Sequence, residues 1–366
     1  MSNSKPRYLQ IYEELLLHIR ERKYLPGDLL PTESEMCEEY QVSRPTIAKA
    51  LKLLSDEKLV KRKAGFGTQV LAPGKAKQKV GFLIPRLQET EIFEPICISI
   101  AETAAAAGVK MMLPAEITAS DDLKIQTEAM AKQLIDAKVH GVFFAPAEHV
   151  IDPQSFNYMI LERLRKHGIH VVLLDRDLYR WPRQTRCDLI GIDNIEAGYV
   201  VATHLLEAGC QRLAFVTRGN PAMTVQLRRM GCREALVQKG LLATSLYTLD
   251  YHTEEPGESV DELLENGVDG IICANDSTAA TLMRNLLDRD IDIPGKVKVC
   301  GFDDVKYASL LSVPLTSYKQ PCKEIGRVAA EIMINRIKFP DEPVRRVTIQ
   351  GQLIERKSSE PLDQPS

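Results

Sequence analysis

The apolar positions at the start of the chain recur at the spacing of helices. Four of them are separated by four, three and four residues and therefore share one helical face: Tyr8, Tyr12, Leu15 and Ile19. The run Thr-Glu-Ser-Glu at 32–35 has the form of a capping box, in which a side chain and the backbone at a helix start satisfy each other's hydrogen bonds. We therefore predict one helix that contains these four apolar residues and a second helix from Thr32 to about Tyr40.

A third helix and a hairpin are predicted to follow. Ser43 can cap this helix, and its inward face is formed by Ile47, Leu51 and Leu54. Two short strands, 59–62 and 68–71, are joined by a turn at 64–67 whose glycines can adopt the positive φ of tight turns. Three helices followed by a hairpin are the layout of a winged helix-turn-helix, an α+β fold.

From Val80 onward, apolar runs alternate with amphipathic stretches. Residues 72–79 are rich in Pro, Gly and Lys and lack periodicity, which predicts a flexible linker between domains at 1–71 and 80–366. The predicted strands are 80–84, 109–113, 141–145, 170–174, 189–192, 212–216, 270–274 and 298–301, and the helices between them include 98–107, 122–137, 195–208 and 277–289. This alternation is typical of parallel βαβ units, and so many strands predict two α/β Rossmann-like subdomains.

Charge separates the two regions. Residues 1–79 contain fifteen Lys and Arg against ten Asp and Glu, a net charge of +5. Because the whole chain carries −3, residues 80–366 carry −8. A basic segment on an acidic remainder favours a polyanionic partner at one end, although ordinary variation between domains would give the same imbalance.

Cysteine usage and hydropathy exclude several classes of protein. None of the eight cysteines forms a CxxC pair, which fits reduced thiols better than disulfides or a zinc site. The start of the chain lacks the apolar stretch of a signal peptide, and no apolar run approaches the roughly 20 residues that span a bilayer. No nucleophile elbow or phosphate-binding loop follows a strand. We expect a cytoplasmic protein that is not an enzyme, with no metal, no cofactor and no membrane contact.

The first turn of the third helix is the candidate nucleic-acid contact. It holds Ser43, Arg44, Pro45 and Thr46, and free backbone N–H groups at a helix start favour a phosphate or a base acceptor. An arginine there can bind guanine O6 and N7 as a fork, worth about 1–3 kcal/mol of discrimination. Further cations lie on the helix and the hairpin: Lys49, Lys52, Lys61, Arg62 and Lys63. A small protein-docking module with a basic face is the alternative.

This region resembles the winged-helix domain of the GntR family, in particular its HutC-like and AraR-like branches. The matching segments are 6–11, 30–36, 42–51 and 65–68. The resemblance implies a homodimer on a double-stranded DNA operator, and the candidate DNA-contacting residues are Arg7, Ser43, Arg44, Pro45, Thr46, Lys49, Arg62 and Gly65. Ala48 stands where the family usually has Arg, and Pro45 replaces a residue that is often polar.

Polar residues follow several strands of the larger region. These are Asp175-Arg176-Asp177, Asp193-Asn194, Asn275-Asp276 and Asp303-Asp304. Ligands of open α/β sheets bind outside the carboxyl ends of the strands, and carboxylates, amides and guanidinium groups suit the hydroxyls of a polyol. Phe93 or Trp181 could cover the apolar face of a sugar ring. Each residue alone also fits a turn or a helix cap, whereas the whole set favours binding.

The larger region resembles the ligand-binding domain of the LacI family, which shares the periplasmic-binding-protein type I fold. Matches lie at 80–85, 141–144, 168–176, 192–194, 209–215, 228–231, 274–276, 301–304 and 314–317. The resemblance implies that the ligand is surrounded by Phe93, Asp175, Arg176, Arg228, Asn275, Asp303 and Gln320. The stretch 87–94 departs from the family pattern, and the short helix that joins the two domains in LacI proteins is replaced by the linker.

These interpretations combine into one hypothesis. We expect a multidomain transcription regulator, a repressor released when a small carbohydrate binds between two hinged subdomains. The N-subdomain is predicted at 80–186 and 316–340, and the C-subdomain at 187–315 and 341–366. An activator, a ligand-requiring repressor, and a sugar receptor whose N-terminal domain docks a protein remain alternatives.

Overall fold

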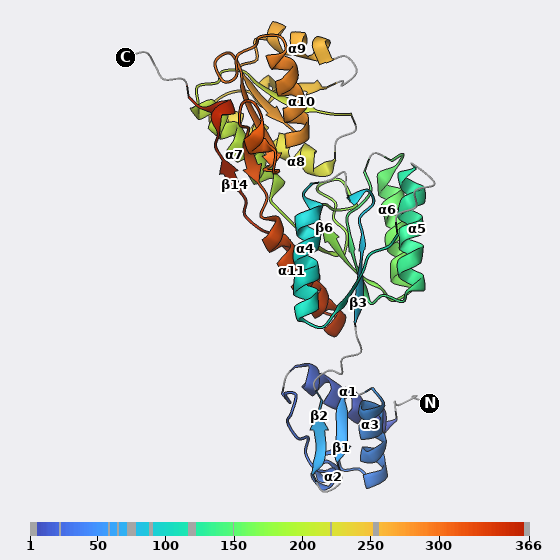
Figure 1. Ribbon diagram of the computed structural model, residues 1–366. Coiled ribbons are helices and arrows are strands. Elements are labelled where there is room, and N and C mark those ends of the chain that lie inside the picture. Colours follow the sequence, from blue (N-terminus) through green and yellow to red (C-terminus); the bar gives the residue numbers. More distant parts are fainter. Residues whose placement is uncertain are drawn as a thin grey trace. The chain divides into compact units, whose positions relative to one another are not determined.

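The chain forms two compact units, Met1–Gln78 and Lys79–Ser366, which are considered separately below (Figure 1). The computed structural model describes residues 6–21, 23–57, 59–63, 66–71, 78–87, 91–115, 122–148, 150–219, 222–251 and 256–361. Most of the predicted linker, residues 72–77, lies outside the described residues.

The first unit contains three helices and an antiparallel hairpin. The elements are α1 (Arg7–Arg20), α2 (Glu33–Tyr40), α3 (Arg44–Asp56), β1 (Val60–Lys63) and β2 (Gly67–Val70). The predicted inward face of α3 is buried, since Ile47, Leu51 and Leu54 pack with Leu15 of α1 in one apolar core. The predicted capping box is present, with Thr32 and Glu35 bonded reciprocally at the start of α2. The winged helix-turn-helix layout is therefore confirmed.

The first half of the second unit, the N-subdomain, is a parallel sheet between two layers of helices. Its strand order is β13-β7-β6-β5-β3-β4. The strands are β3 (Lys79–Leu83), β4 (Lys110–Met112), β5 (Gly141–Phe144), β6 (His170–Leu174), β7 (Asp188–Gly191) and β13 (Arg346–Thr348). Figure 1 shows α4 (Phe93–Ala106) and α11 (Cys322–Lys338) on one face, and α5 (Leu123–Asp136) and α6 (Pro153–Lys166) on the other.

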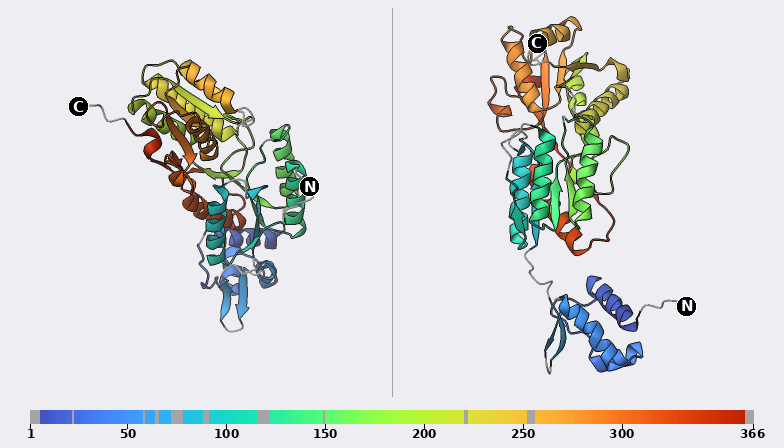
Figure 2. Two further views of the ribbon diagram at one scale, coloured as in Figure 1. Left: turned by 45° about the horizontal axis from the view of Figure 1, so that its top comes forward. Right: turned by 90° about the vertical axis from the view of Figure 1, so that its right-hand side faces the viewer.

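The C-subdomain repeats this architecture. Its strand order is β14-β12-β11-β10-β8-β9, parallel except for β14 at the edge. The strands are β8 (Leu213–Thr217), β9 (Tyr247–Asp250), β10 (Gly270–Cys273), β11 (Lys298–Asp303), β12 (Thr316–Lys319) and β14 (Gln352–Ile354). The helices are α7 (Asn194–Glu207), α8 (Met223–Gln238), α9 (Pro256–Glu265) and α10 (Asp276–Leu287), with short 3-10 turns η2 (Ala243–Ser245), η3 (Ala308–Leu310) and η4 (Lys357–Ser359). Figure 2 shows both sheets from other sides.

The chain crosses between the subdomains at places that differ from the predicted boundaries at 187, 316 and 341. β7 belongs to the N-subdomain because it pairs with β6 and β13. β12 belongs to the C-subdomain because it pairs with β11. The crossings therefore lie at 192–193, 320–321 and 349–351, each directly after a strand of one sheet, so that all three segments lie close to the strand ends.

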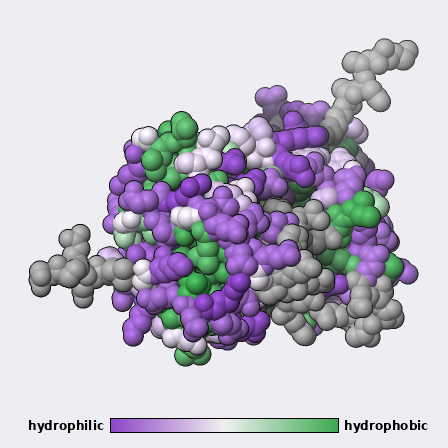
Figure 3. Space-filling view, turned by 90° about the horizontal axis from the view of Figure 1, so that it is seen from above, coloured by the Kyte–Doolittle hydropathy of each residue, from purple (hydrophilic) through white to green (hydrophobic). Residues whose placement is uncertain are grey.

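The surface is mostly hydrophilic. On the face shown in Figure 3, apolar residues form small separate groups among polar ones. Within the part of the chain that the structure describes, no helix is long and apolar enough to cross a membrane.

Candidate functional site

The first turn of α3 presents polar side chains to solvent. Ser43 occupies the N-cap position, but among the described contacts its hydroxyl makes no cap bond and instead lies 3.1 Å from Thr46 Oγ1. The predicted side-chain cap is therefore not formed. Pro45 fits the first turn because a helix start leaves N–H groups unpaired in any case. The side chain of Arg44 is 72% exposed, so that a guanidinium group and two hydroxyls are available at this tip.

One carboxylate links the tip of α3 to the hairpin. Arg44 Nε lies 3.4 Å from Glu33 Oε2, at the start of α2. Arg62 on β1 donates to the other oxygen of the same carboxylate. Because Glu33 holds both guanidinium groups, it orients side chains from the helix and the hairpin together. Sequence reasoning placed Glu33 only in the capping box and missed this role.

The remaining predicted contacts lie on α1, α3 and the hairpin. Lys49 Nζ lies 4.1 Å from the centroid of the Tyr8 ring, which brings the start of α1 beside α3. Arg7 is exposed and donates to Gln10 Oε1 at 2.8 Å. Gly65 lies outside the described residues, whereas Gly67 at the end of the turn has the predicted positive φ, +94°.

In the second unit, contacts join the predicted ligand residues at the carboxyl ends of the strands. From the N-subdomain, Asp175 follows β6 and its Oδ2 accepts a bond from Arg176 Nη1 at 3.0 Å. The Arg176 guanidinium lies 5.6 Å from the centroid of the Phe93 ring, at the start of α4. The side chain of Asp175 is only 4% exposed, and within the described residues its Oδ1 is buried without a hydrogen-bond partner. This oxygen is therefore a buried acceptor whose hydrogen-bonding capacity the described residues leave unused.

From the C-subdomain, Arg228 on α8 is buried and its donors are directed to three acceptors. Nε donates to Asn194 Oδ1 at 2.9 Å, Nη1 to the Ala274 carbonyl at 2.8 Å, and Nη2 lies 3.5 Å from Asp303 Oδ1. The same Asp303 oxygen accepts a bond from Gln320 at 2.7 Å, in the segment that crosses between the subdomains. Burial raises the pKa of Asp303, and the positive charge of Arg228 opposes this rise.

Two glycines place Arg228 by letting α7 and α8 approach closely. A Cβ on Gly198 of α7 would lie 1.8 Å from the carbonyl oxygen of Arg228, and a Cβ on Gly231 of α8 would lie 1.9 Å from that of Ile195. Backbone at this distance leaves no room for a side chain, so that glycine at both positions fixes the depth of Arg228 in the subdomain.

Several of the other strand-end residues have structural partners. Asp193 caps α7. Asp177 accepts bonds from the Tyr179 and Thr185 amides, from the Thr185 hydroxyl and from Arg346, and it thereby holds the loop before β7. Asp304 accepts a bond from Arg356 at 2.6 Å. These three carboxylates therefore have structural roles: Asp193 caps a helix, Asp177 holds a loop, and Asp304 is paired with Arg356.

Asn275 combines both roles. Its Oδ1 caps α10 by accepting from the Thr278 amide at 2.9 Å, while in the described structure its Nδ2 has no acceptor and can donate to a ligand. Trp181, the alternative aromatic, is 53% exposed on the loop before β7, and none of the described contacts joins it to the other predicted ligand residues.

Two acidic residues near the predicted ligand residues were not identified from the sequence. Glu148 Oε2 lies 3.2 Å from Arg176 Nη1, and Glu91 lies near Tyr307 and Asp303, which both affect the pKa of its carboxyl. Burial raises the pKa of both carboxyls, and Arg176 opposes the rise for Glu148. Glu148 follows β5, but the rule that polar residues directly after a strand bind ligands did not find it because three residues intervene. We call Glu91, Phe93, Glu148, Asp175, Arg176, Arg228, Asn275, Asp303 and Gln320 the cleft set.

The neighbouring Asp276 is completely buried beneath this set. Its oxygens accept bonds from the Ser317 hydroxyl at 2.6 Å and from the Val305 amide at 3.0 Å. Burial, reinforced by the charge of Asp303, raises the pKa of Asp276 to about 8. Asp276 thus ties α10 to β12 and to the loop after β11.

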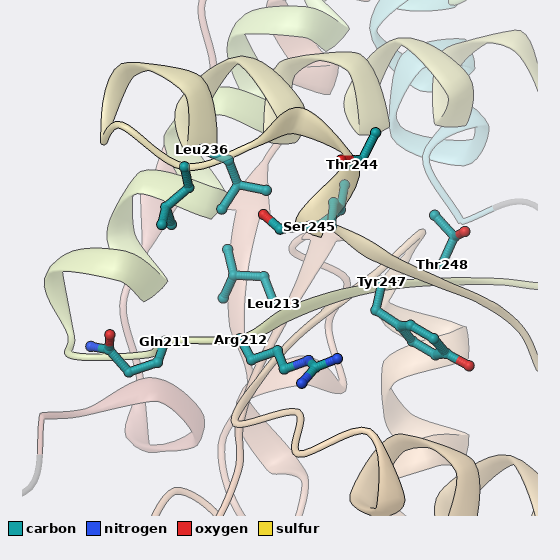
Figure 4. Close-up of a pocket in the computed structure, with 10 residues that line it drawn as sticks. Gln211, Arg212, Leu213, Leu236, Thr244, Ser245, Tyr247 and Thr248 are labelled. Atoms are coloured by element: carbon teal, nitrogen blue, oxygen red, sulfur yellow. The ribbon is translucent and has the colours of Figure 1, made fainter.

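A hollow of about 460 Å³ lies at the opposite ends of the strands. Its lining includes Arg212 and Leu213 at the start of β8, Leu236 of α8, and Tyr247 at the start of β9 (Figure 4). None of the cleft set contributes to its lining. Among the described residues, no group of three or more His, Cys, Asp or Glu is placed to hold a metal ion.

Comparison with known proteins matches each unit to a family. Residues 7–70 match the bacterial regulatory proteins of the gntR family, and residues 202–359 match the periplasmic binding protein-like domain. Along the whole chain, an arabinose metabolism transcriptional repressor of Geobacillus stearothermophilus is 26% identical, with 98% of each chain covered. Its counterpart from Halalkalibacterium halodurans is also 26% identical, over 91% of this chain and 89% of the relative.

Solved structures show the same fold. A LacI family transcriptional regulator from Enterococcus faecium with bound ribose superposes with a TM-score of 0.64 at 24% identity, covering 78% of this chain and all of that chain. A complex of the transcriptional regulator CelR with cellobiose gives a TM-score of 0.64 at 20% identity, covering 90% of this chain and all of that one. The chain therefore joins a domain that matches the gntR family of bacterial regulatory proteins to a domain that matches the periplasmic binding protein-like model and shares the fold of these LacI family structures.

Proposed function

We propose that this chain is a DNA-binding transcription repressor that is released from its operator when a small carbohydrate binds between the N- and C-subdomains. One observation carries the proposal: the chain holds an exposed guanidinium at the tip of α3, Arg44, and a buried acceptor without a partner in the cleft set, Asp175 Oδ1. The guanidinium can donate hydrogen bonds to the edge of a base, and the carboxylate oxygen can accept a hydrogen bond from a sugar hydroxyl.

In the DNA-binding half, we assign base contacts to Ser43, Arg44 and Thr46 and positioning contacts to the remaining predicted residues, Arg7, Pro45, Lys49, Arg62 and Gly65. Contacts to phosphates fix orientation, while base contacts specify sequence. A helix-turn-helix reads two half-sites through a two-fold symmetric protein, so that we propose a homodimer on a pseudo-palindromic operator in the cytoplasm. The repressor names of the relatives support this assignment.

In the effector-binding half, the polar members of the cleft set would bind hydroxyls, and Phe93 would form an apolar wall. Asp175 Oδ1 accepts, Asn275 Nδ2 donates, and the second oxygen of Asp303 faces the ligand. The ribose and cellobiose complexes of structures with the same fold support a sugar. The function requires binding and no catalytic step.

Coupling between the halves would run through movement of the subdomains. Ligand that contacts both sides favours the closed form by its differential affinity, and a coupling free energy of about 1–3 kcal/mol is typical. Closure about the three crossing segments would change the spacing of the two DNA-reading helices in the dimer.

The test begins with duplexes selected by the full-length protein from a random-sequence library. Affinity for the selected duplex should fall steeply as salt rises, because phosphate contacts release counterions. Arg44→Ala should weaken binding at least about tenfold, a loss of roughly 1.4 kcal/mol, whereas the matched exposed cation Lys23→Ala should change it little. A protein that selects no duplex is a sugar receptor with a protein-docking domain, and the proposal fails.

Addition of sugar decides the sign of regulation. Release of the selected duplex by one of the aldopentoses, aldohexoses or disaccharides supports the repressor assignment. Tighter binding in the presence of sugar would show an activator or a ligand-requiring repressor instead.

A further inference from the structure

Both guanidinium groups of the cleft set are already neutralised by the protein's own carboxylates. Arg176 Nη1 lies 3.0 Å from Asp175 Oδ2 and 3.2 Å from Glu148 Oε2. The Nη2 of Arg228 is directed to Asp303, and its other two donor groups are taken up by neutral acceptors. Within the cleft set, therefore, both guanidinium groups already have a carboxylate partner from the protein itself.

Another cation near the strand ends is directed elsewhere. Arg218 follows β8, and its Nη2 donates to the Ser277 carbonyl at 3.2 Å and to the Thr281 hydroxyl at 2.9 Å, both on α10. Arg218 thus ties β8 to α10. Its Nε is buried without a hydrogen-bond partner among the described residues, and none of its described contacts joins it to a member of the cleft set.

Acidic groups outnumber basic ones in the cleft set by four to two: Glu91, Glu148, Asp175 and Asp303 against Arg176 and Arg228. The carboxylates are close enough to act on one another, because Asp175 raises the pKa of both Glu148 and Asp303, and Asp303 raises that of Glu91. A phosphate brought into this partly buried site would meet like charges, whereas a hydroxyl would find acceptors.

Glu148 is held firmly in the position that blocks access to Arg176. The loop that carries it is fixed by Asn157 of α6, which bonds both the amide and the carbonyl of Ala147. Arg176 Nε is bonded in turn to the Pro146 carbonyl at 3.1 Å. The backbone amide of Met223, at the start of α8, also lies near Glu148 and lowers the pKa of its carboxyl.

We infer that Glu148 makes the cleft selective for unphosphorylated sugars by occupying the Arg176 guanidinium that a sugar phosphate would need. The inference rests on the proposed sugar response and adds its chemical class. The effector is then a sugar that has not been phosphorylated, rather than the product of a phosphorylating reaction.

Calorimetric titration of the full-length protein tests the selectivity with matched pairs. The probes are the aldopentoses and aldohexoses, their terminal phosphates such as D-ribose 5-phosphate and D-glucose 6-phosphate, and D-glucosamine as a cationic probe. The free sugar that binds best should exceed its own phosphate by about a hundredfold in affinity, the factor expected when like charges are brought together in a partly buried site.

The outcomes separate this inference from the function on which it rests. If a sugar phosphate binds as tightly as its free sugar, the selectivity is overturned while the sugar response stands. Tighter binding of glucosamine than of glucose would support the excess of negative charge. If no free sugar and no sugar phosphate binds, the sugar response fails and the inference fails with it.

Glu148→Gln isolates the assigned residue because it keeps shape and removes charge. The ratio of affinities for the free sugar and its phosphate should fall at least about tenfold, as Arg176 becomes available to the phosphate. The matched control is Glu91→Gln, which removes a cleft charge that lies near Tyr307 and for which the described ion pairs give no guanidinium partner. An unchanged ratio in Glu148→Gln, or an equal fall in both variants, would overturn the assignment.

A charge-conserving variant keeps the inference testable should Glu148→Gln fold poorly. Glu148→Asp retains the negative charge beside Arg176, and we expect it to keep most of the wild-type discrimination against the phosphate. If Glu148→Asp loses that discrimination as completely as Glu148→Gln or more so, the shape of the site and not its charge sets the selectivity, and the assignment is wrong.

Discussion

Arg44 and Arg228 are the same residue type in opposite settings. The Arg44 side chain is 72% exposed and has one long contact to a single carboxylate, whereas the Arg228 side chain is 5% exposed and reaches three acceptors. An exposed guanidinium costs little to detach from its partner and can be given to DNA. A buried guanidinium with satisfied donors cannot leave without exposing unpaired groups, so that it stays in place and holds the geometry of the site.

The difference teaches how the two regions should respond to change. At the tip of α3, side chains act one by one, so that substitutions should alter affinity and leave the fold intact. In the cleft set, each charged group is a partner of another, so that a substitution should alter stability and ligand binding together. The expectations below test whether the two regions are separable in this way.

Arg228→Ala should have the largest effect. The change leaves Asp303 without its cationic partner and Asn194 and the Ala274 carbonyl without a donor, so that we expect the free energy of unfolding to fall by about 3 kcal/mol. The variant should still bind the selected duplex and should no longer be released by sugar. Urea unfolding and gel shifts with and without sugar measure both properties.

The control for this change is an arginine of the same unit on its surface. Arg327 on α11 is 47% exposed and pairs only with Glu324 and Glu331. Arg327→Ala should stay within about 0.5 kcal/mol of the wild type, as surface substitutions do. If Arg228→Ala weakened duplex binding as much as Arg44→Ala does, the two regions would not be separable.

Gly198→Ala should have the second largest effect, through packing alone. The added methyl group would meet the carbonyl oxygen of Arg228, and moving α8 away to relieve the overlap should cost about 2 kcal/mol. Because Arg228 moves with α8, affinity for sugar should fall without any change in the chemistry of the cleft. Thermal unfolding and calorimetric titration measure the two effects.

A second helical glycine supplies the matched control. A Cβ on Gly257 of α9 would meet no atom within 4 Å, so that Gly257→Ala should be neutral or slightly stabilising. A loss of stability in Gly257→Ala equal to that in Gly198→Ala would mean that the close approach of α7 and α8 is not the cause.

The fold of the DNA-binding unit could be predicted from the sequence because the patterns that specify its helices and hairpin are local. The capping box, the apolar spacing of α3 and the glycines of the hairpin each specify structure within a few residues. The same reasoning failed for α8, since the buried Arg228 and the packed Gly231 interrupt its apolar periodicity. The strands β9, β12, β13 and β14 were also absent from the prediction.

The candidate ligand residues could be predicted from the sequence only in part. Asp175 and Asp304 both follow strands, but Arg356, far along the chain, takes up Asp304, while one oxygen of Asp175 keeps no partner among the described residues. A single sequence does not contain this distinction, because it depends on contacts between distant segments. Glu148 escaped notice for a related reason, since its partner Arg176 lies after the neighbouring strand β6, far along the chain.

The pH dependence of stability should report on the buried carboxylate beneath the cleft. The folded-state pKa of Asp276, about 8, lies above its unfolded value near 4, so that the folded protein retains a proton that the unfolded chain releases. Its contribution to stability is therefore fully present below about pH 4 and is lost as pH rises toward 8, at no more than about 1.4 kcal/mol per pH unit. Urea unfolding across this range measures the slope.

Asp276→Asn removes this titration and preserves the shape of the side chain. The amide can still accept from the Val305 backbone and donate to the Ser317 hydroxyl, so that the slope between pH 4 and 8 should become smaller than in the wild type. Asp303, whose pKa is also raised by burial, remains in the variant and leaves a residual slope. An identical slope in both proteins would show that Asp276 is ionised in the folded state.

Glu33→Gln should have the smallest effect and should act on the other region. Glu33 holds Arg44 and Arg62, and its negative charge lies beside the groups that we assign to DNA. Its removal should tighten binding to the selected duplex by about two- to fivefold, the range of an exposed ion pair, and leave the response to sugar unchanged. The control, Glu38→Gln on the same helix, alters charge equally at an exposed position away from both arginines. If the two variants bind the duplex equally well, net charge governs the affinity. If Glu33→Gln binds the duplex more weakly than the wild type does, the orientation of the arginines by Glu33 outweighs its repulsion of the phosphates. The tip of α3 is then a prearranged site rather than a set of independent side chains.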